Sequence, residues 1–293
     1  MTLVTAAFSF GRDHDLLCLL RELASDPVVA DGEQPSLNGR LPVVIHDFRS
    51  DVDANRTWIA ISGDSSLLGF TLERLCAAAF DRIHLQHHIG EHPRLGALDH
   101  CSMITTDAMP YGQCGAALYF AEALATRHNL PVYLPHRNDA WFALREQGFG
   151  SLFDRQLSPD FGPSHVNEQL GVAAVWVRPF FLTVAIAVQE ERADFLKMRV
   201  RDIRQRRADG EAMFAGVEAI AYAAPSDACS RIVIEFSDPD NAPPDPVIEW
   251  LDRRAGVAGL RVQSVEAIGA VRRVDLLETR SIPVRESQIV DMI

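Results

Sequence analysis

Histidines gather in one short stretch of this chain, where five of the ten fall between residues 84 and 100. At its centre is the run GEHPRLGALD, which places Glu91, His92, Arg94 and Asp99 between two expected strands. An imidazole that titrates near neutrality, beside a fixed cation and two carboxylates, can act as general acid and base. A polar loop that only hydrogen-bonds to itself is the competing interpretation. We expect the His92 ring to be reachable from solvent.

A metal site is the rival chemistry for these histidines, because His84, His87, His88 and His92 have ligand-like spacing. We expect a strand over residues 82–88, in which His84 and His88 share a face and His87 points the other way. The sequence has no HExxH motif and no CxxC pair, so we expect no metal ion. A metal-dependent hydrolase built on residues 84–100 stays open as an alternative.

Two further segments carry polar residues between expected elements. The run DVDANRT contains Asn55 and Arg56, which could clamp a carboxylate or simply solvate a turn. The run PDFGPS contains Gly162, Pro163 and Ser164 and leads on to Gly171. These residue types suit a loop that wraps a ligand, and they equally suit a plain connection.

The hydrophobic period alternates between that of strands and that of helices. In the first part we expect strands at residues 3–8, 41–48, 57–62 and 82–88, and helices from Asp13 and over 66–81. A strand at 101–105, a helix at 112–129, a strand at 132–134 and a loop at 149–169 follow. In the second part we expect strands at 180–188, 216–223, 231–236 and 260–265, and helices at 190–207 and 246–255.

This order predicts an α+β fold. Each half reads as strand–helix–strand–strand–helix–strand, the βαββαβ order of ferredoxin-like folds. We therefore expect two such subdomains, over residues 1–179 and 180–293. The duplication is argued from the order of elements alone.

Composition narrows the function classes. The 293 residues carry a net charge of −12, and 47% are hydrophobic. An acidic chain lacks the basic footprint of nucleic-acid binding. The longest apolar runs are far shorter than the roughly 20 residues of a membrane helix, and the start does not resemble a signal peptide. With five cysteines and no disulfide framework, we expect a cytoplasmic protein that acts on a small molecule.

Taken together, the runs GEHPRLGALD, DANRTWIAISG, NLPVYL and PDFGPS resemble the formiminotransferase domain family, to which glutamate formimidoyltransferase belongs. The resemblance implies two α/β subdomains whose sheets face each other with helices outside. It implies transfer of a formimino group from N-formimino-L-glutamate to tetrahydrofolate, which is a co-substrate, without a metal. It also makes a homodimer and a separate cyclodeaminase conceivable partners.

The resemblance implies roles for individual residues. His92 takes the position of the family's catalytic histidine. Substrate- and folate-binding roles are implied for Asp47, Asn55, Arg56, Glu91, Arg94, Gly162, Pro163, Ser164, Gly171 and Arg178. Arg56 and Arg94 would hold substrate carboxylates or order the loop that carries His92.

Several polar positions of the family pattern are replaced. Ala7, Phe10, Arg49, Ala185 and Ala187 stand where the family carries amides or carboxylates. Loss of a buried polar partner costs about 1–3 kcal/mol. This indicates a divergent member with a changed substrate or without catalysis. A non-catalytic folate- or acid-binding protein on the same scaffold is therefore the alternative function.

Overall fold

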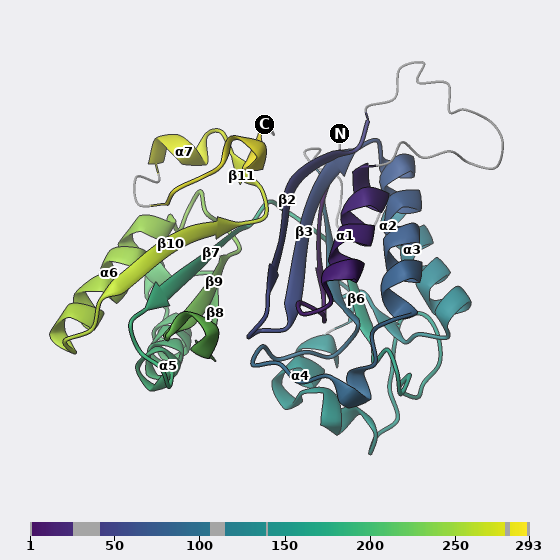
Figure 1. Cartoon of the computed structure of the whole chain (residues 1–293), viewed down its shortest axis with the longest axis horizontal. Coiled ribbons are helices and arrows are strands. Elements are labelled where there is room, and N and C mark those ends of the chain that lie inside the picture. The colour runs from purple at the N-terminus through teal and green to yellow at the C-terminus, as the bar shows by residue number, and fades with distance from the viewer. Residues whose placement is uncertain (1, 26–41, 106–114, 139, 279–281, 292–293) are drawn as a thin grey trace. The chain divides into compact units, whose positions relative to one another are not determined.

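The computed structural model of the chain describes residues 2–25, 42–105, 115–138, 140–278 and 282–291. The chain divides into two compact units. The first comprises Met1–Asp51 and Asn55–Arg178, and the second comprises Val52–Ala54 and Pro179–Ile293. Each unit has its own central sheet (Figure 1).

A six-stranded mixed sheet forms the centre of the first unit, in the order β2-β3-β1-β4-β6-β5. Neighbours among β2, β3, β1 and β4 are antiparallel, whereas β6 runs parallel to both β4 and β5. The strands are β1 (Thr2–Phe8), β2 (Val44–Asp51), β3 (Arg56–Gly63), β4 (Leu98–Thr105), β5 (Val132–Tyr133) and β6 (Ala173–Arg178).

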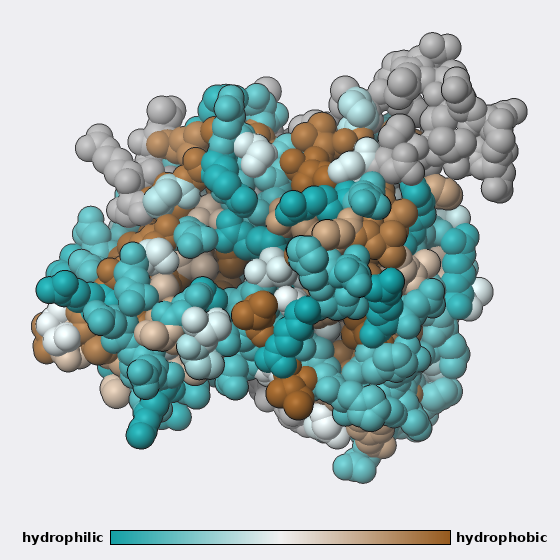
Figure 2. Space-filling view, in the orientation of Figure 1, coloured by the Kyte–Doolittle hydropathy of each residue, from teal (hydrophilic) through white to brown (hydrophobic). Residues whose placement is uncertain are grey.

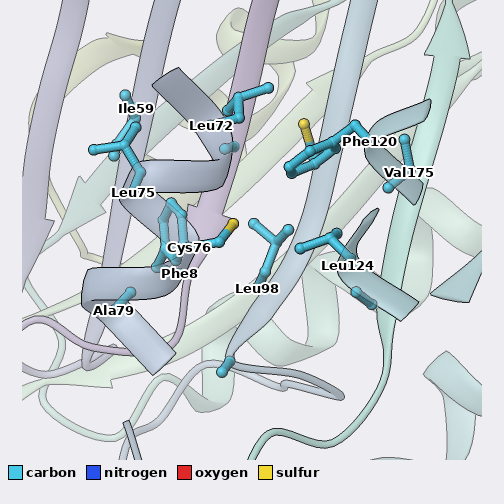
Figure 3. Packing of buried hydrophobic residues seen from close by; sticks show 14 of the residues in the cluster. Phe8, Ile59, Leu72, Leu75, Cys76, Ala79, Leu98, Phe120, Leu124 and Val175 are labelled. Carbon is cyan, nitrogen blue, oxygen red and sulfur yellow. The ribbon is translucent and has the colours of Figure 1, made fainter. Parts of the chain in front are cut away.

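Three helices cover one face of this sheet: α1 (His14–Ser25), α2 (Ser65–Phe80) and α3 (Gly115–His128). The Asp13 carboxylate accepts the Leu16 N–H at 2.9 Å at the start of α1, and Asp64 caps α2 in the same way. Such caps satisfy amides that have no partner within the helix. Figure 3 shows Leu72 and Leu75 of α2 and Phe120 and Leu124 of α3 packed over the strands.

This packing fixes the two faces of the sheet. The helix-covered core contains Phe8, Ile59, Cys101 and Val175, one from each of four strands. Successive side chains of a strand point to opposite faces. Ala7, Trp58 and His100 therefore lie on the second face, and the strand register aligns them in one row with Arg49 of β2.

A smaller apolar cluster lies on the second face near β5. It joins Tyr133 to Trp141 and Leu144 of α4 (Ala140–Gln147) and to Leu152 of the 3₁₀ helix η2 (Phe149–Leu152). These side chains are at most 5% exposed, so α4 is held firmly against this edge of the sheet.

The second unit contains a four-stranded antiparallel sheet in the order β10-β7-β9-β8. Its strands are β7 (Leu182–Val188), β8 (Val217–Ala224), β9 (Cys229–Phe236) and β10 (Val262–Ile268). Helix α5 (Asp194–Ala208) links β7 to β8, and α6 (Pro244–Val257) links β9 to β10. An edge-to-face contact between Phe214 and Trp250, with ring centroids 5.3 Å apart, joins the α5–β8 connection to α6.

Short elements complete the described chain. They are η1 (Leu85–His87), η3 (Ala212–Phe214), η4 (Pro225–Asp227), β11 (Val271–Arg272), α7 (Asp275–Glu278), η5 (Glu286–Gln288) and β12 (Ile289–Val290). Arg272 donates to the carboxylates of Asp240 and Asp275, which ties β11 to the start of the α6 segment and to α7.

The α+β class and most of the expected elements are confirmed, but the strand expected at residues 82–88 is wrong. This segment is a turn and η1, and its backbone bonds locally and to Gln169: the Leu85 N–H donates to the Gln169 carbonyl at 2.9 Å. Ile83 and Leu85 are both buried, and these two residues hold the loop against the core. Their spacing of two residues produced the strand-like alternation in the sequence. Strand β6 and helix α4 were not expected.

The starts of two expected elements, Leu41 and Gly112, lie outside the described residues. Within the described part of the chain, the helices are all too short or too polar to cross a membrane. Figure 2 shows polar residues over most of the visible face, with apolar residues in small separate patches.

Candidate functional site

The loop that carries His92 is fastened to the segment before β6. Gly96 and Gly171 form an isolated antiparallel bridge. On either side of it, the Ala97 N–H donates to the Leu170 carbonyl at 2.8 Å and the Val172 N–H to the Leu95 carbonyl at 3.1 Å. A Cβ on Gly96 would lie 1.8 Å from the Val172 carbonyl oxygen, so only glycine fits. The structure thus brings Gly171 to the His92 loop.

A buried ion pair lies beneath this loop. Arg56, the first residue of β3, donates from Nη2 to Oδ2 of Asp99 at 2.8 Å. The other carboxylate oxygen of Asp99 accepts the Leu95 N–H at 2.7 Å. Burial alone would raise the pKa of Asp99, but the Arg56 cation and these hydrogen bonds outweigh it and hold the pKa well below its usual range. Asp99 is therefore ionised and orders the backbone before β4.

His92 lies beside this pair and is 9% exposed, which makes it more buried than expected. Its Nδ1 is 2.6 Å from the Pro93 carbonyl oxygen. A carbonyl only accepts, so Nδ1 carries the proton and the basic lone pair is on Nε2. Burial lowers the pKa of His92 well below its ordinary value of 6.5, and the Arg56 cation adds to this effect. The ring is a neutral base at pH 7.

Trp58 connects His92 to the sheet. Its indole meets the His92 ring edge to face, with centroids 6.0 Å apart, and the Arg56 guanidinium lies 5.8 Å from the indole centroid. Arg56 and Trp58 are two residues apart on β3 and so share the second face. One aromatic side chain thereby contacts both the imidazole and the cation of the candidate site.

Asn55 joins the turn before β3 to two other loops. It adopts a left-handed backbone conformation (φ 49°), accepts the Gly11 N–H at 2.7 Å and donates to the Ile89 carbonyl at 2.9 Å. His88 Nε2 lies 3.0 Å from the Asn55 carbonyl oxygen, and Arg94 donates to the His88 carbonyl. Burial, with Arg94, lowers the pKa of His88 from 6.5 to about 4.

The structure therefore joins Asn55, Arg56, Arg94 and Gly171 to the segment that carries His92, through Ile89, Asp99, His88 and Gly96 respectively. Glu91 is an exposed neighbour of His92. Asp47 lies on β2, where its carboxylate binds Arg49 at 3.0 Å. Arg178 ends β6, and since it pairs with Ile104 while Ala174 pairs with His100, about 13 Å of sheet separates it from His100.

The PDFGPS segment contacts β5 and the residues beside it. Gly162, with φ 87°, approaches the Leu130 carbonyl so closely that a Cβ would lie 2.2 Å from its oxygen. Asp160 accepts the Leu134 N–H at 2.8 Å, and Phe161 bridges Val132 at the start of β5. Pro163 is half-buried and Ser164 is exposed. These contacts give the start of the segment a role in fastening β5.

Sequence reasoning named Asp99 as a carboxylate of the His92 loop, but it named His88 only as a possible metal ligand and Arg49 only as a replaced family position, and it did not name Trp58. Trp58 could have been found from its spacing of two residues from Arg56 on a strand. The position of Arg49 depends on strand register, which the sequence does not reveal.

In the described part of the chain, no group of three or more histidine, cysteine, aspartate or glutamate side chains is placed to hold a metal ion.

Buried polar atoms without partners do occur at the site and on the second face of the sheet. They are Arg56 Nε, Arg94 Nε, His88 Nδ1, Thr5 Oγ1 and Ser102 Oγ. Such atoms are unfavourable unless a ligand or water completes their hydrogen bonds.

A family model described as the formiminotransferase domain, N-terminal subdomain, matches residues 5–178. The formimidoyltransferase-cyclodeaminase of Sus scrofa is 26% identical over 248 residues, which cover 80% of this chain and 46% of the relative. The glutamate formimidoyltransferase of Streptococcus pyogenes serotype M1 is 24% identical and covers 60% and 62%, respectively. That of Thermoplasma acidophilum is 26% identical and covers 73% and 69%. The chain spans about half the length of the first curated relatives it matches.

Proposed function

Since the chain belongs to the formiminotransferase domain family, N-terminal subdomain, over residues 5–178, we propose that it is a one-carbon transferase. It moves a formimino group from N-formimino-L-glutamate, or a related one-carbon donor, to tetrahydrofolate. The observation that carries this proposal is a neutral, buried His92 with its basic nitrogen set on Nε2 by the Pro93 carbonyl. The names of the relatives support the reaction class.

The proposed chemistry follows from what the transfer requires. An amine of the acceptor attacks the one-carbon centre and must lose a proton, and the leaving amine must gain one. His92 Nε2 takes the first proton and delivers it to the leaving nitrogen. Arg56, Asp99 and Arg94 hold the loop so that the imidazole keeps its position.

Tetrahydrofolate would contact the second face of the first unit's sheet. The hydroxyls of Thr5 and Ser102 are neighbours in the strand register there, and both are buried without a partner. A pteridine carries the donors and acceptors that would satisfy them.

The second unit repeats the βαββαβ order with its fourth strand beside the first, which supports the ferredoxin-like description of both units.

Binding without catalysis is the second candidate function, favoured by the apolar Ala7 in the row beside Trp58 and by the burial of His92. Turnover and binding are separated by two measurements on the same preparation. Incubation with N-formimino-L-glutamate and tetrahydrofolate, followed by acid, should yield the 5,10-methenyl product. Calorimetry with 5-formyltetrahydrofolate measures affinity. Product formation supports the transferase, and binding without product supports the binding protein. If neither product nor binding is observed, both candidate functions are wrong.

The cellular setting is a further proposal. We expect a cytoplasmic protein that forms a homodimer. The fused name of the pig relative suggests a cyclodeaminase as a partner. A sedimentation measurement on the purified chain decides the oligomeric state.

A further inference from the structure

Strand β8 leaves the second unit's sheet with an open edge. It pairs with β9 on one side and ends the strand order β10-β7-β9-β8 on the other. The Ser237 N–H donates to the Gly216 carbonyl at 3.0 Å, so the next residue, Val217, is a non-hydrogen-bonded position of the antiparallel ladder. The backbone groups of Val217, and of every second residue after it, therefore point away from β9.

The next three outward-pointing residues are Ala219, Ala221 and Ala223. Among the described residues, no hydrogen bond reaches their backbone N–H and C=O groups. At the start of the edge the Val217 carbonyl is already bound, because Arg207 donates to it at 3.1 Å. Residues 219–223 thus offer a row of main-chain donors and acceptors to another strand, and their alanine methyl groups leave room for its side chains.

Helix α5 carries a row of positive charge along this edge. The helix packs on β8, and its buried residues are Leu196, Val200 and Ile203. Lys197, Arg201 and Arg204 are spaced by four and three residues, so they form one stripe along the side of the helix. All three are exposed, and none of them makes an ion pair with a described residue.

This cationic stripe lies on the side of α5 that faces away from α6. Figure 1 shows α5 beside β8 and α6 beside β10. On the opposite side of α5, Arg206 lies 5.9 Å from the Trp250 ring of α6 and binds Glu211 at 2.8 Å. Since α5 covers the edge strand and α6 lies on its inner side, the cationic stripe projects beyond the edge of the sheet.

The edge and the stripe together favour an extended acidic segment. An open sheet edge binds an added strand through main-chain hydrogen bonds, which give affinity for many sequences. The three cations beside the edge attract carboxylates and repel basic side chains. A second copy of this chain is a poorer occupant, because pairing β8 with its own copy would bring two cationic stripes side by side.

We propose that β8 and the cationic stripe of α5 form a docking site for an extended acidic segment of another protein, which adds to this sheet as a fifth strand. The segment pairs with the outward backbone groups of residues 219–223. Because alternate side chains of a strand share a face, every second aspartate or glutamate of the segment points toward Lys197, Arg201 and Arg204. The proposal does not depend on the one-carbon transfer.

The test measures binding of short labelled peptides to the full chain by fluorescence anisotropy. The first peptide alternates glutamate with threonine, and the second has the same sequence with alternate backbone nitrogens methylated. The third replaces glutamate by lysine. The wild type should bind the first peptide and lose most of this affinity with the other two, since the second lacks the donors for strand pairing and the third has the wrong charge.

Variants of the stripe show where the peptide binds. Arg201→Glu should weaken binding of the acidic peptide by about tenfold, because it reverses one charge beside the edge. Arg261→Glu makes the same change at an exposed residue before β10, at the opposite edge of the sheet, and should leave the affinity unchanged. In the wild type, the acidic peptide should also slow hydrogen exchange at the amides of Ala219, Ala221 and Ala223.

Three results would overturn the proposal. Absence of binding by the acidic peptide removes the docking site. Equal binding of the methylated peptide shows that charge alone attracts it and that no strand is added. A dimer in sedimentation that protects the same three amides without any peptide assigns the edge to a second copy of this chain.

Discussion

His92 is buried although it lies close to charged groups. Its ring is neutral because desolvation and the Arg56 cation both disfavour the protonated form. The hydrogen bond to the Pro93 carbonyl fixes which nitrogen is basic. These properties suit a residue that accepts a proton and returns it, provided that substrate reaches Nε2.

The pH dependence of the reaction follows from the lowered pKa of His92. A base must be unprotonated, so kcat/KM should stay level from pH 8 down to the ordinary value of 6.5 and fall only at lower pH. Initial rates at low substrate concentration over pH 5–9 measure this. An acid limb with its midpoint above 7 would contradict a buried, neutral imidazole.

The Arg56–Asp99 pair should make a large contribution to stability. Asp99→Asn leaves a buried guanidinium without its anion, which should lower the free energy of unfolding by about 3–5 kcal/mol. Urea unfolding measures the change. Glu249→Gln, which breaks an exposed pair with Arg253, is the matched control and should change stability by less than about 1 kcal/mol. Equal losses in the two variants would refute the structural role of the buried pair.

At the scale of elements, the site depends on the bridge between Gly96 and Gly171. This bridge joins the His92 loop to the segment before β6, and both glycines lie against opposing backbone. Neither β4 nor β6 alone would position the loop. The site therefore depends on a long-range pairing that forms only when the sheet is complete.

Glycine-to-alanine substitutions test this bridge. Gly96→Ala would place a Cβ 1.8 Å from the Val172 oxygen, so it should destabilise the protein by about 2–4 kcal/mol. Gly69→Ala, in the interior of α2 with open space at its Cβ, should instead stabilise it by about 0.5–1 kcal/mol. Thermal unfolding of both variants gives the signs. A tolerated Gly96→Ala would show that the close approach is not required.

Much of the fold could be predicted from sequence, because periodicity and caps are local. Helix α1 begins after Asp13 as expected. The loop at 82–88 could not be distinguished from a strand, since two buried anchors imitate alternation. The assembly of Asn55, Arg56, Arg94 and His92 was suggested by motifs, whereas Arg49 and Trp58 required the register. The burial that shifts the pKa of His92 depends on packing from distant segments.

At the scale of the whole molecule, acid should weaken folding well before the carboxylates titrate. The folded-state pKa of His88 is lowered to about 4, and that of His92 is also lowered, so below pH 6.5 the unfolded chain binds more protons than the folded chain. Stability that is present above pH 6.5 is therefore lost as pH falls toward 4.

This linkage is measurable as the difference in unfolding free energy between pH 7.5 and pH 5. The wild type should be less stable at pH 5, and His88→Gln should show a smaller difference because one of the four described histidines with a lowered pKa, which also include His128 and His136, is gone. If His88→Gln retains the full wild-type difference, His88 does not carry its share of the linkage.

The central claim is that His92 moves the proton during one-carbon transfer, and single-turnover kinetics test it most directly. Excess enzyme is mixed with N-formyl-L-glutamate or N-formimino-L-glutamate and tetrahydrofolate, and the transferred carbon is followed for the wild type, His92→Gln and the exposed His84→Gln. We expect transfer in the wild type and in His84→Gln, and a rate lower by a factor of about 10²–10⁴ in His92→Gln. Transfer by His92→Gln at the wild-type rate would contradict the account.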